Sequence, residues 1–321
     1  MKAVAMSRGM IKGIGKIVDI AVLIGIVLML SFAAYALWDS NQIYQAADKS
    51  HYAVYKPTIK DEGKSFKELQ SINPEVFSWL SVYGTNIDYP VTQGQDNMKY
   101  VNTNAEGLYS LSGAIFLDHN NNLDFCDFNS IVYGHHMEKK TMFGEIGDFS
   151  DSAMFESHQY GNLYYDGANH GIEFFAFLHT DAYDRAVFSA NVKEDERQSY
   201  LDGLLAKAKY TRNIIVTEDD HIIMLSTCSS DSTNGRDILI GRIGDDVYEN
   251  LFLKDNEDDK KVNHGTYSLD NLGIEMSMLP RYLTIISASL MFVCTLLIGV
   301  RYGIQKKKMK QKSTKAEQGY L

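Results

Sequence analysis

A cysteine at the end of an apolar run is the residue of this chain whose setting best fits covalent chemistry. Residues 222–227 read Ile-Ile-Met-Leu-Ser-Thr, Cys228 follows them, and the polar loop 229–235 leads to Arg236. A loop between two strands would bring the thiol and the guanidinium together. Thiolates attack carbonyl groups, and a fixed cation stabilises the oxyanion that results. The alternative is a buried structural cysteine, which is the commoner role of this residue.

A second apolar run ends in a pair of histidines. Residues 130–133 are followed by Gly134, His135 and His136. The glycine permits a tight turn or a close approach of two backbones. Because successive side chains of an extended segment point to opposite sides, at most one of the histidines faces a given partner. Cysteine, histidine and arginine together support acyl transfer, although the sequence reveals no carboxylate or amide that would orient the histidine.

The histidines and cysteines have two alternative uses, metal binding and a disulfide. The histidine pair could bind a metal, but no third ligand stands at a recognisable spacing and no HExxH or CxxC pattern is present. We therefore expect neither a metal site nor a cofactor. Cys126 lies in the polar stretch 120–129 and is interpreted as a loop cysteine; its pairing with Cys228 stays an open alternative.

The two ends of the chain predict a membrane protein. Residues 17–38 and 283–300 are apolar runs that approach the length of a membrane span. A cleaved signal peptide is the alternative for the first run, but its apolar part is longer than usual. Basic residues flank both runs on the terminal side, which by the positive-inside rule places both termini in the cytoplasm and residues 39–282 outside. These basic residues are Lys2, Arg8, Lys12, Lys16, Arg301, Lys306, Lys307, Lys308, Lys310, Lys312 and Lys315.

The segment between the two runs is strongly acidic. Residues 39–282 hold 20 of the 31 basic residues and 39 of the 41 acidic ones, which gives a net charge of −19. Such a charge argues against nucleic acid as a partner.

The pattern of this outer segment predicts a mainly β domain. Residues 42–80 have near-helical spacing of apolar residues, with a break around Lys56-Pro57-Thr58. Short apolar runs bounded by turn residues then predict strands, and six to eight strands in one unit favour a closed or nearly closed β-barrel. The expected strands are 87–91, 112–117, 130–133, 172–179, 222–227 and 236–243, and the expected helices are 142–146, 152–158 and 194–208.

Several strings, taken in order, resemble the sortases, which are cysteine transpeptidases of Gram-positive cell envelopes. Leu225-Ser226-Thr227-Cys228 with Arg236 is similar to their cysteine motif, and Tyr133-Gly134-His135-His136-Met137 to their histidine segment. Strings typical of the class B branch are Asn73-Pro74-Glu75-Val76, Trp79-Leu80, Gly84-Thr85-Asn86-Ile87-Asp88-Tyr89-Pro90-Val91 and Gly113-Ala114-Ile115-Phe116-Leu117-Asp118.

The resemblance implies an eight-stranded barrel with an N-terminal helical extension and a helix before the last strands. The two apolar runs add a transmembrane helix on each side of it. It implies that Cys228 is the nucleophile, His135 the general acid/base and Arg236 the cation that stabilises the oxyanion. The residues that it implies for substrate binding are Asn97, Tyr133, Ser226 and Thr227. The expected segments are a cytoplasmic N-terminus (1–16), a span (17–38), a helical extension (39–80), the barrel (81–254), an acidic tether (255–282), a second span (283–300) and a basic tail (301–321).

The implied reaction is cleavage of an LPxTG-like or NPxTN-like sorting pentapeptide near the C-terminus of a secreted protein. A Cys228 thioester would then pass the protein to an amine of a lipid-linked peptidoglycan precursor. The alternatives are a pilin polymerase, whose acceptor is a protein lysine, and a membrane-tethered binding barrel without activity. Two features depart from the class B pattern: Met224 stands where the motif has threonine, and a second span follows the barrel.

Overall fold

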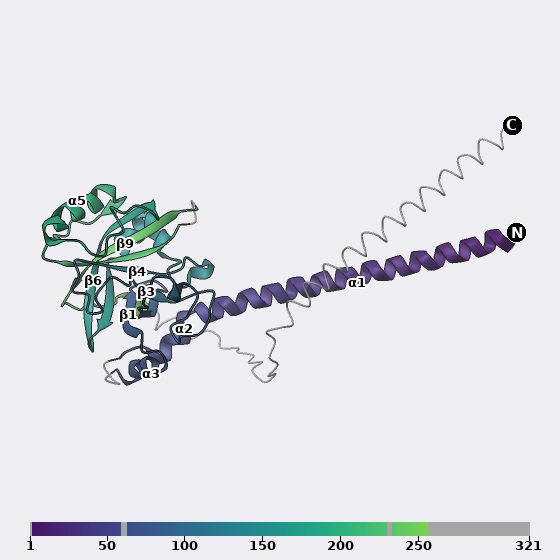
Figure 1. The fold of residues 1–321 in the computed structure, drawn as a ribbon, viewed down its shortest axis with the longest axis horizontal. Coiled ribbons are helices and arrows are strands. Elements are labelled where there is room, and N and C mark those ends of the chain that lie inside the picture. Colours follow the sequence, from purple (N-terminus) through teal and green to yellow (C-terminus); the bar gives the residue numbers. More distant parts are fainter. Residues whose placement is uncertain (1, 59–62, 230–232, 256–321) are drawn as a thin grey trace, which may run out of the picture. The chain divides into compact units, whose positions relative to one another are not determined.

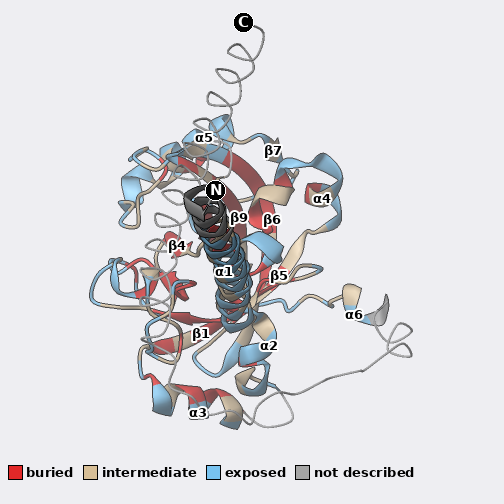
Figure 2. Cartoon of the chain, turned by 90° about the vertical axis from the view of Figure 1, so that its right-hand side faces the viewer, coloured by how far each residue is buried: buried red, intermediate tan, exposed pale blue. Residues whose placement is uncertain are grey.

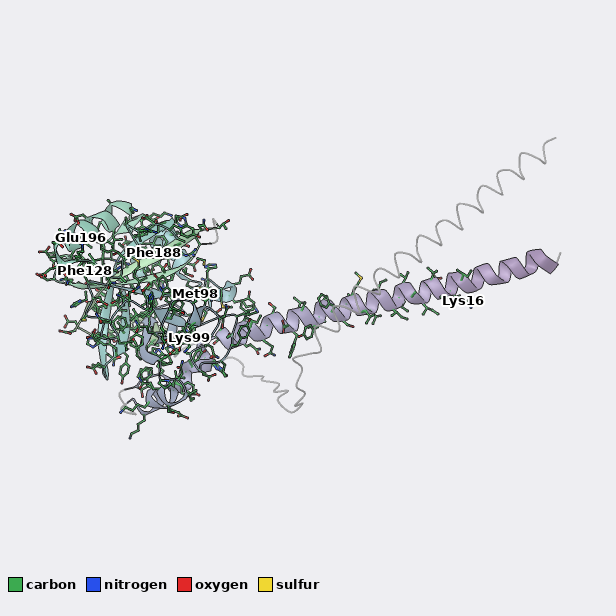
Figure 3. The ribbon with its side chains drawn as sticks, viewed as in Figure 1. Lys16, Met98, Lys99, Phe128, Phe188 and Glu196 are labelled. Atoms are coloured by element: carbon green, nitrogen blue, oxygen red, sulfur yellow. The ribbon has the colours of Figure 1, made fainter. Side chains whose placement is uncertain are left out.

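The computed structural model describes residues 2–58, 63–229 and 233–255, and it divides the chain into two compact units. The first unit begins with the long helix α1 (Lys2–Ala47), of which residues up to 41 belong to it. Within the described residues, Gly13–Ala47 is the one helical stretch long and apolar enough to cross a membrane, and its most apolar 18-residue window has a mean hydropathy of 2.6. Lys16 projects from this helix (Figure 3). The predicted second span lies outside the described residues.

The second unit, Gln42–His264, is built on a closed barrel of eight strands (Figure 1). The strands follow the order β5-β1-β2-β3-β4-β8-β9-β6, and pairing of β5 with β6 closes the ring. All neighbours are antiparallel except β2 with β3 and β4 with β8. A short strand, β7 (Tyr210–Thr211), pairs with β6 outside the ring. The barrel strands are β1 (Val76–Val82), β2 (Asp88–Thr92), β3 (Ile115–Leu117), β4 (Asn129–Tyr133), β5 (Tyr160–Tyr165), β6 (Ala168–Asp181), β8 (His221–Cys228) and β9 (Gly235–Gly244).

Helices cover the outside of the barrel, and the strands are its most deeply buried part (Figure 2). The largest is α5 (Arg197–Lys207), which follows the turn η6 (Glu194–Glu196) as predicted. The others are α2 (Lys49–Tyr52), η1 (Ala53–Tyr55), α3 (Lys64–Ile72), η3 (Lys99–Val101), η4 (Glu138–Lys140), η5 (Ile146–Ser150), α4 (Ser152–Ser157) and α6 (Phe252–Asp255).

Strand β8 is apolar on both faces because it separates two cores. Ile223 and Leu225 belong to the core inside the barrel. Ile222 and Met224 belong to a second core outside it, together with Leu201 of α5. The alternation follows from the pleat of a strand, and burial on both faces explains the unbroken apolar run. Met224, the departure from the family motif, is therefore a buried apolar residue of the outer core.

The structure corrects several element assignments. Residues 76–80, expected in a helix, form most of β1, because Asn73 adopts an extended conformation ahead of Pro74 and α3 ends at Ile72. The barrel thus begins at Val76, before the predicted boundary at residue 81. The helix expected at 142–146 does not form: Met142 has a φ of 52°, and the turn η5 begins only at Ile146. Strands β5 and β7 were not predicted.

Candidate active site

The hairpin of β8 and β9 brings the thiol and the guanidinium together. In the antiparallel register Cys228 lies directly opposite Arg236, and the Ser229 N–H donates to the Gly235 carbonyl at 2.8 Å across the loop. Residues directly opposite in a strand pair present their side chains on the same face. Cys228 is exposed and is not in a disulfide, and the same is true of Cys126.

Strand β4 brings the histidine to the same edge of the barrel. It runs parallel to β8, and Tyr133 pairs with Ser226, so both strands end beside each other. Gly134 follows, and its N–H donates to the Ser226 carbonyl at 3.2 Å. A Cβ atom on Gly134 would lie 2.5 Å from Ile115 Cδ1 and 2.7 Å from Phe143 Cδ2. The glycine therefore makes room for two packed side chains, and not for a second backbone as predicted.

A backbone carbonyl orients the His135 ring. Its Nε2 lies 2.8 Å from the Val101 carbonyl oxygen, which can only accept, so Nε2 carries a proton. In the neutral ring, Nδ1 is then the free nitrogen that takes up or gives a proton. Val101 ends η3, a turn within a loop that has no sequence periodicity, so sequence reasoning did not find this partner.

Residues from five parts of the chain line one pocket of about 430 Å³ at this edge. All seven residues predicted for the site contribute to its lining. The lining residues are Asn97, Val101, Phe116, Tyr133, Gly134, His135, Ala182, Phe188, Ser226, Thr227, Cys228 and Arg236. His136 is absent from this lining, as expected of the neighbour of His135 in an extended segment.

Aromatic rings form one wall of the pocket. The Tyr133 ring packs between Phe116 and Phe188, with centroid distances of 5.4 Å and 6.5 Å. Phe188 belongs to the segment after β6 and packs against the outer core, of which Phe128 is a member. Both residues lie in the part of the barrel unit that contains α5 (Figures 1 and 3). The pocket therefore opens on the outer face of the barrel, beside the outer core.

Two buried hydroxyl groups at the pocket have no partner within the described part of the chain. These are Ser226 Oγ and Thr227 Oγ1, and each residue is 2% exposed. Ser226 shares the face of Cys228, whereas strand alternation directs the Thr227 side chain to the other face. An unpaired buried hydroxyl is unfavourable, so Ser226 gains from a ligand that bonds to it.

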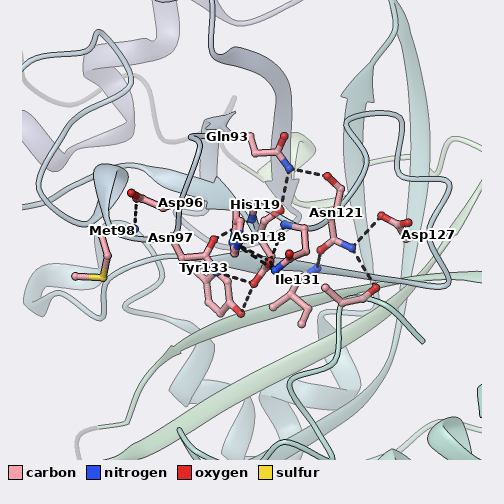
Figure 4. Close-up of polar contacts among 12 residues, drawn as sticks. Gln93, Asp96, Asn97, Met98, Asp118, His119, Asn121, Asp127, Ile131 and Tyr133 are labelled. Atoms are coloured by element: carbon pink, nitrogen blue, oxygen red, sulfur yellow. Dashed lines mark hydrogen bonds and ion pairs between the residues drawn. The ribbon is translucent and has the colours of Figure 1, made fainter. Parts of the chain in front are cut away.

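Asn97 and Tyr133 are held by one carboxylate, that of Asp118 (Figure 4). Asp118 Oδ2 accepts from Asn97 Nδ2 at 2.7 Å and from the Tyr133 hydroxyl at 3.0 Å. Burial of the phenol and the charge of Asp118 raise the pKa of Tyr133 well above its ordinary value, so the hydroxyl stays protonated. Sequence reasoning did not identify Asp118 as part of the site.

Arg236 supplies positive charge at the pocket. Its guanidinium donates to the Gly235 carbonyl at 2.9 Å, and among the described residues no carboxylate lies within ion-pair distance of it. An arginine stays charged at any working pH. The charge is thus available to an anion that forms beside Cys228.

Comparisons with known proteins agree with this architecture. No protein-family model matches the chain. The chain is 30% identical over 187 residues to sortase B of Listeria monocytogenes, which covers 58% of this chain and 75% of the relative. It is similar to a solved sortase B from the type II pilus of Streptococcus pneumoniae, with 46% identity, a TM-score of 0.50, and coverage of 56% of this chain and 99% of that one. A class B sortase involved in pilus biogenesis in Streptococcus pyogenes matches at 37% identity and a TM-score of 0.53, over 57% of this chain and 99% of that one.

The class of protein is therefore that of the sortases, cysteine transpeptidases built on a closed β-barrel. Within that class, the chain belongs to the sortase B family.

Proposed function

We propose that this protein cleaves a sorting pentapeptide near the C-terminus of a secreted protein and transfers the protein to an amine. The observation that supports the proposal most is the meeting of Cys228, His135 and Arg236 at one pocket. These residues come from the ends of three strands, and the register fixes two of them opposite each other. A nucleophile, an acid/base group and a cation at one pocket are what acyl transfer from a peptide requires.

The reaction has two halves that use the same three side chains. The Cys228 thiolate attacks the carbonyl carbon that precedes the scissile bond, and Arg236 stabilises the oxyanion. The imidazolium of His135 protonates the departing amine, and the C–N bond breaks to leave a thioester. An acceptor amine then attacks the thioester, His135 takes up its proton, and the thiolate leaves. One peptide bond is broken and one amide is formed, so no outside source of energy is needed.

The shape and polarity of the pocket suit an extended peptide. Its wall is formed by the rings of Phe116, Tyr133 and Phe188, and its polar groups include Asn97 and Ser226. Such a mixture of aromatic surface and a few placed polar groups is typical of specific ligand sites. We propose that Asn97, Tyr133, Ser226 and the Thr227 strand position bind an LPxTG-like or NPxTN-like sequence.

The N-terminal helix would hold the enzyme at the membrane. Its apolar stretch exceeds the length that a bilayer needs; Lys2, Arg8 and Lys12 precede it, and Lys16 lies near its start. By the positive-inside rule this charge favours a cytoplasmic N-terminus, with the barrel on the outer side. An outward-facing barrel meets both secreted substrates and lipid-linked acceptors.

We propose the amine of a lipid-linked peptidoglycan precursor as acceptor, with a protein lysine as the second candidate. The likeness to two pilus sortases, one at 46% identity, favours the second candidate over a non-enzymatic barrel. Both acceptors present a primary amine to the same thioester, so the chemistry at Cys228 is the same.

The test uses a fluorescence-quenched sorting peptide. Cys228→Ala should abolish its cleavage, because the thioester can no longer form, while thermal unfolding stays unchanged. Full activity of this variant would contradict the proposal. Mass spectrometry of the product formed from a peptidoglycan amine or a lysine peptide then distinguishes the two acceptors.

A further inference from the structure

Asp118 is a buried carboxylate whose position the backbone fixes from two sides. It follows β3, its N–H donates to the Ile131 carbonyl at 2.8 Å, and its own carbonyl accepts from Gln93 Nε2 at 2.8 Å. The side chain is 8% exposed. Among the described residues, the one basic group within ion-pair distance is His119 Nδ1, at 3.5 Å. A buried carboxylate without a lysine or arginine must be stabilised by hydrogen bonds.

Four donors supply these hydrogen bonds (Figure 4). Oδ1 accepts from the backbone N–H and from Nδ2 of Asn120, both at 2.9 Å. Oδ2 accepts from Asn97 Nδ2 and from the Tyr133 hydroxyl. An ionised carboxylate only accepts hydrogen bonds, so every one of these contacts has a defined direction.

The direction of these bonds determines what Asn97 and Tyr133 offer to a ligand. Tyr133 gives its only hydroxyl proton to Asp118, so its oxygen is left as an acceptor. Asn97 must direct its NH2 group to Asp118, and its Oδ1 accepts from the His119 N–H at 2.9 Å. The second N–H of Asn97 remains a donor. Both side chains line the pocket that contains Cys228.

We propose that Asp118 is a positioning residue that fixes Asn97 as a donor and Tyr133 as an acceptor for the peptide bound beside Cys228. This inference rests on the proposed function, since it assigns the pair a peptide to bind. One residue of an extended peptide directs its N–H and its C=O to the same side, and these two groups match an acceptor and a donor that a single carboxylate holds. Asp118 does not line the pocket itself and acts through the two side chains that do.

The kinetic test compares Asp118→Ala with Asn120→Ala in the full chain. Asn120 bonds to the same carboxylate but does not line the pocket, so its variant reports on damage to the loop alone. We expect Asp118→Ala to raise KM for the sorting peptide about 10- to 100-fold while kcat changes little, because binding contacts are lost that ground state and transition state share. Asn120→Ala should stay within about threefold of the wild type in both constants.

A combined variant separates positioning from general structural damage. When Asn97→Ala and Tyr133→Phe are already present, adding Asp118→Ala should change KM less than about twofold, because its two partners are gone. An undiminished effect in this background, or a wild-type KM for Asp118→Ala alone, would overturn the inference.

A titration gives a readout that needs no activity. Asp118→Asn keeps the shape of the side chain but removes its charge, so the Tyr133 phenol should ionise at lower pH than in the wild type. The measurement is the 13Cζ chemical shift of labelled tyrosine, assigned with Tyr133→Phe. An unchanged titration contradicts the role of Asp118. Absence of peptide cleavage by the wild type, with the Tyr133 titration shifted as expected, contradicts the proposed function instead.

Discussion

At the scale of single residues, the site depends on where two neighbouring histidines point. His135 lines the pocket and donates from Nε2 to the Val101 carbonyl. His136 lies one residue further on, forms an isolated bridge with Met142, and leaves its buried Nδ1 without a partner among the described residues. The chain thus contains its own matched control, since the two residues have the same chemistry in different places.

We predict that His135→Ala lowers kcat/KM for a sorting peptide by about 100- to 10,000-fold, the usual contribution of a general acid/base. The kcat/KM of His136→Ala, calculated per molecule of folded protein, should remain within about fivefold of the wild-type value. Steady-state assays of both variants check the assignment. An inactive His136→Ala with an active His135→Ala would reverse it.

Gly134 gives a second prediction at this scale. A methyl group there would overlap Ile115 and Phe143, so the backbone before His135 must shift. Gly134→Ala should destabilise the protein by about 1–3 kcal/mol, as overpacking does. It should also lower kcat for the sorting peptide by a larger factor than it raises KM. Thermal unfolding and kinetics measure the two effects. Gly203→Ala is the control. Gly203 lies in α5, and a Cβ atom added there would have no atom within 4 Å outside the backbone of its own helix. Alanine at this position should therefore stabilise the helix slightly.

The sequence predicted part of the site because some of it lies on strands. Cys228 and Arg236 end two apolar runs joined by a short loop, so their meeting follows from a hairpin alone. Val101 and Asp118 could not be assigned in this way. Val101 reaches His135 through tertiary packing, and Asp118 acts through contacts with Asn97 and Tyr133, neither of which has a signature in residue spacing.

At the scale of elements, the outer wall of the pocket depends on how the segment after β6 is held. Asp184 accepts from the Thr180 hydroxyl at 2.8 Å and from the Ala186 N–H at 3.1 Å, and it bonds to Lys207 of α5. The hydrogen bond from Lys207 is the main cause that lowers the pKa of Asp184, against partial burial. The segment held in this way includes Phe188 of the aromatic wall.

Because the pKa of Asp184 is lower in the folded than in the unfolded protein, its stabilisation is present above the ordinary aspartate pKa and is lost as the pH falls below it. We predict that Asp184→Asn lowers the unfolding temperature at pH 7 and that the difference from the wild type disappears towards pH 2–3. Thermal unfolding followed by circular dichroism between pH 2 and pH 7 measures the difference in unfolding temperature. Asp195→Asn, at an exposed position on η6, is the control, and a difference that persisted at low pH would contradict the role of the charge.

Elements were predicted well where apolar pattern and turn residues agreed, and poorly where two patterns overlapped. Strands β4, β8 and β9 lie close to their expected bounds. Residues 76–80 continue the apolar spacing of α3, so periodicity alone extended the helix through Pro74. Strand β5 was missed because its tyrosines and Asn162 give no clear alternation, and its place is fixed by pairing with β1 and β6.

At the scale of the whole molecule, the barrel unit contains both of its cores. Residues 42–264 form one compact unit, and the apolar clusters inside and outside the barrel lie entirely within it. Only 11% of the most apolar 18-residue window of α1 is buried. The stability of the barrel therefore has its source in its own strands and helices.

We predict that a fragment of residues 42–264 folds without the rest of the chain. The full-length protein is measured in detergent. The unfolding temperature of the fragment should lie within about 4 °C of that of the barrel in the full-length protein, which corresponds to about 1 kcal/mol in the free energy of unfolding. Scanning calorimetry of both proteins tests this, with Cys228→Ala versions of each as controls for thiol oxidation. A fragment that melts without a cooperative transition would contradict it.

The parallel pairing of β4 with β8 has a consequence for the order in which the protein forms. His135 and Cys228 belong to neighbouring strands that are far apart along the chain, and β8 also pairs with β9. Contacts between distant parts of a chain close a large loop and form slowly. The strand that ends at Cys228 is among the last along the chain, so the thiol comes to lie beside the histidine only after the last strands have joined the ring. The thiol and the histidine are thus kept apart until the barrel is nearly complete.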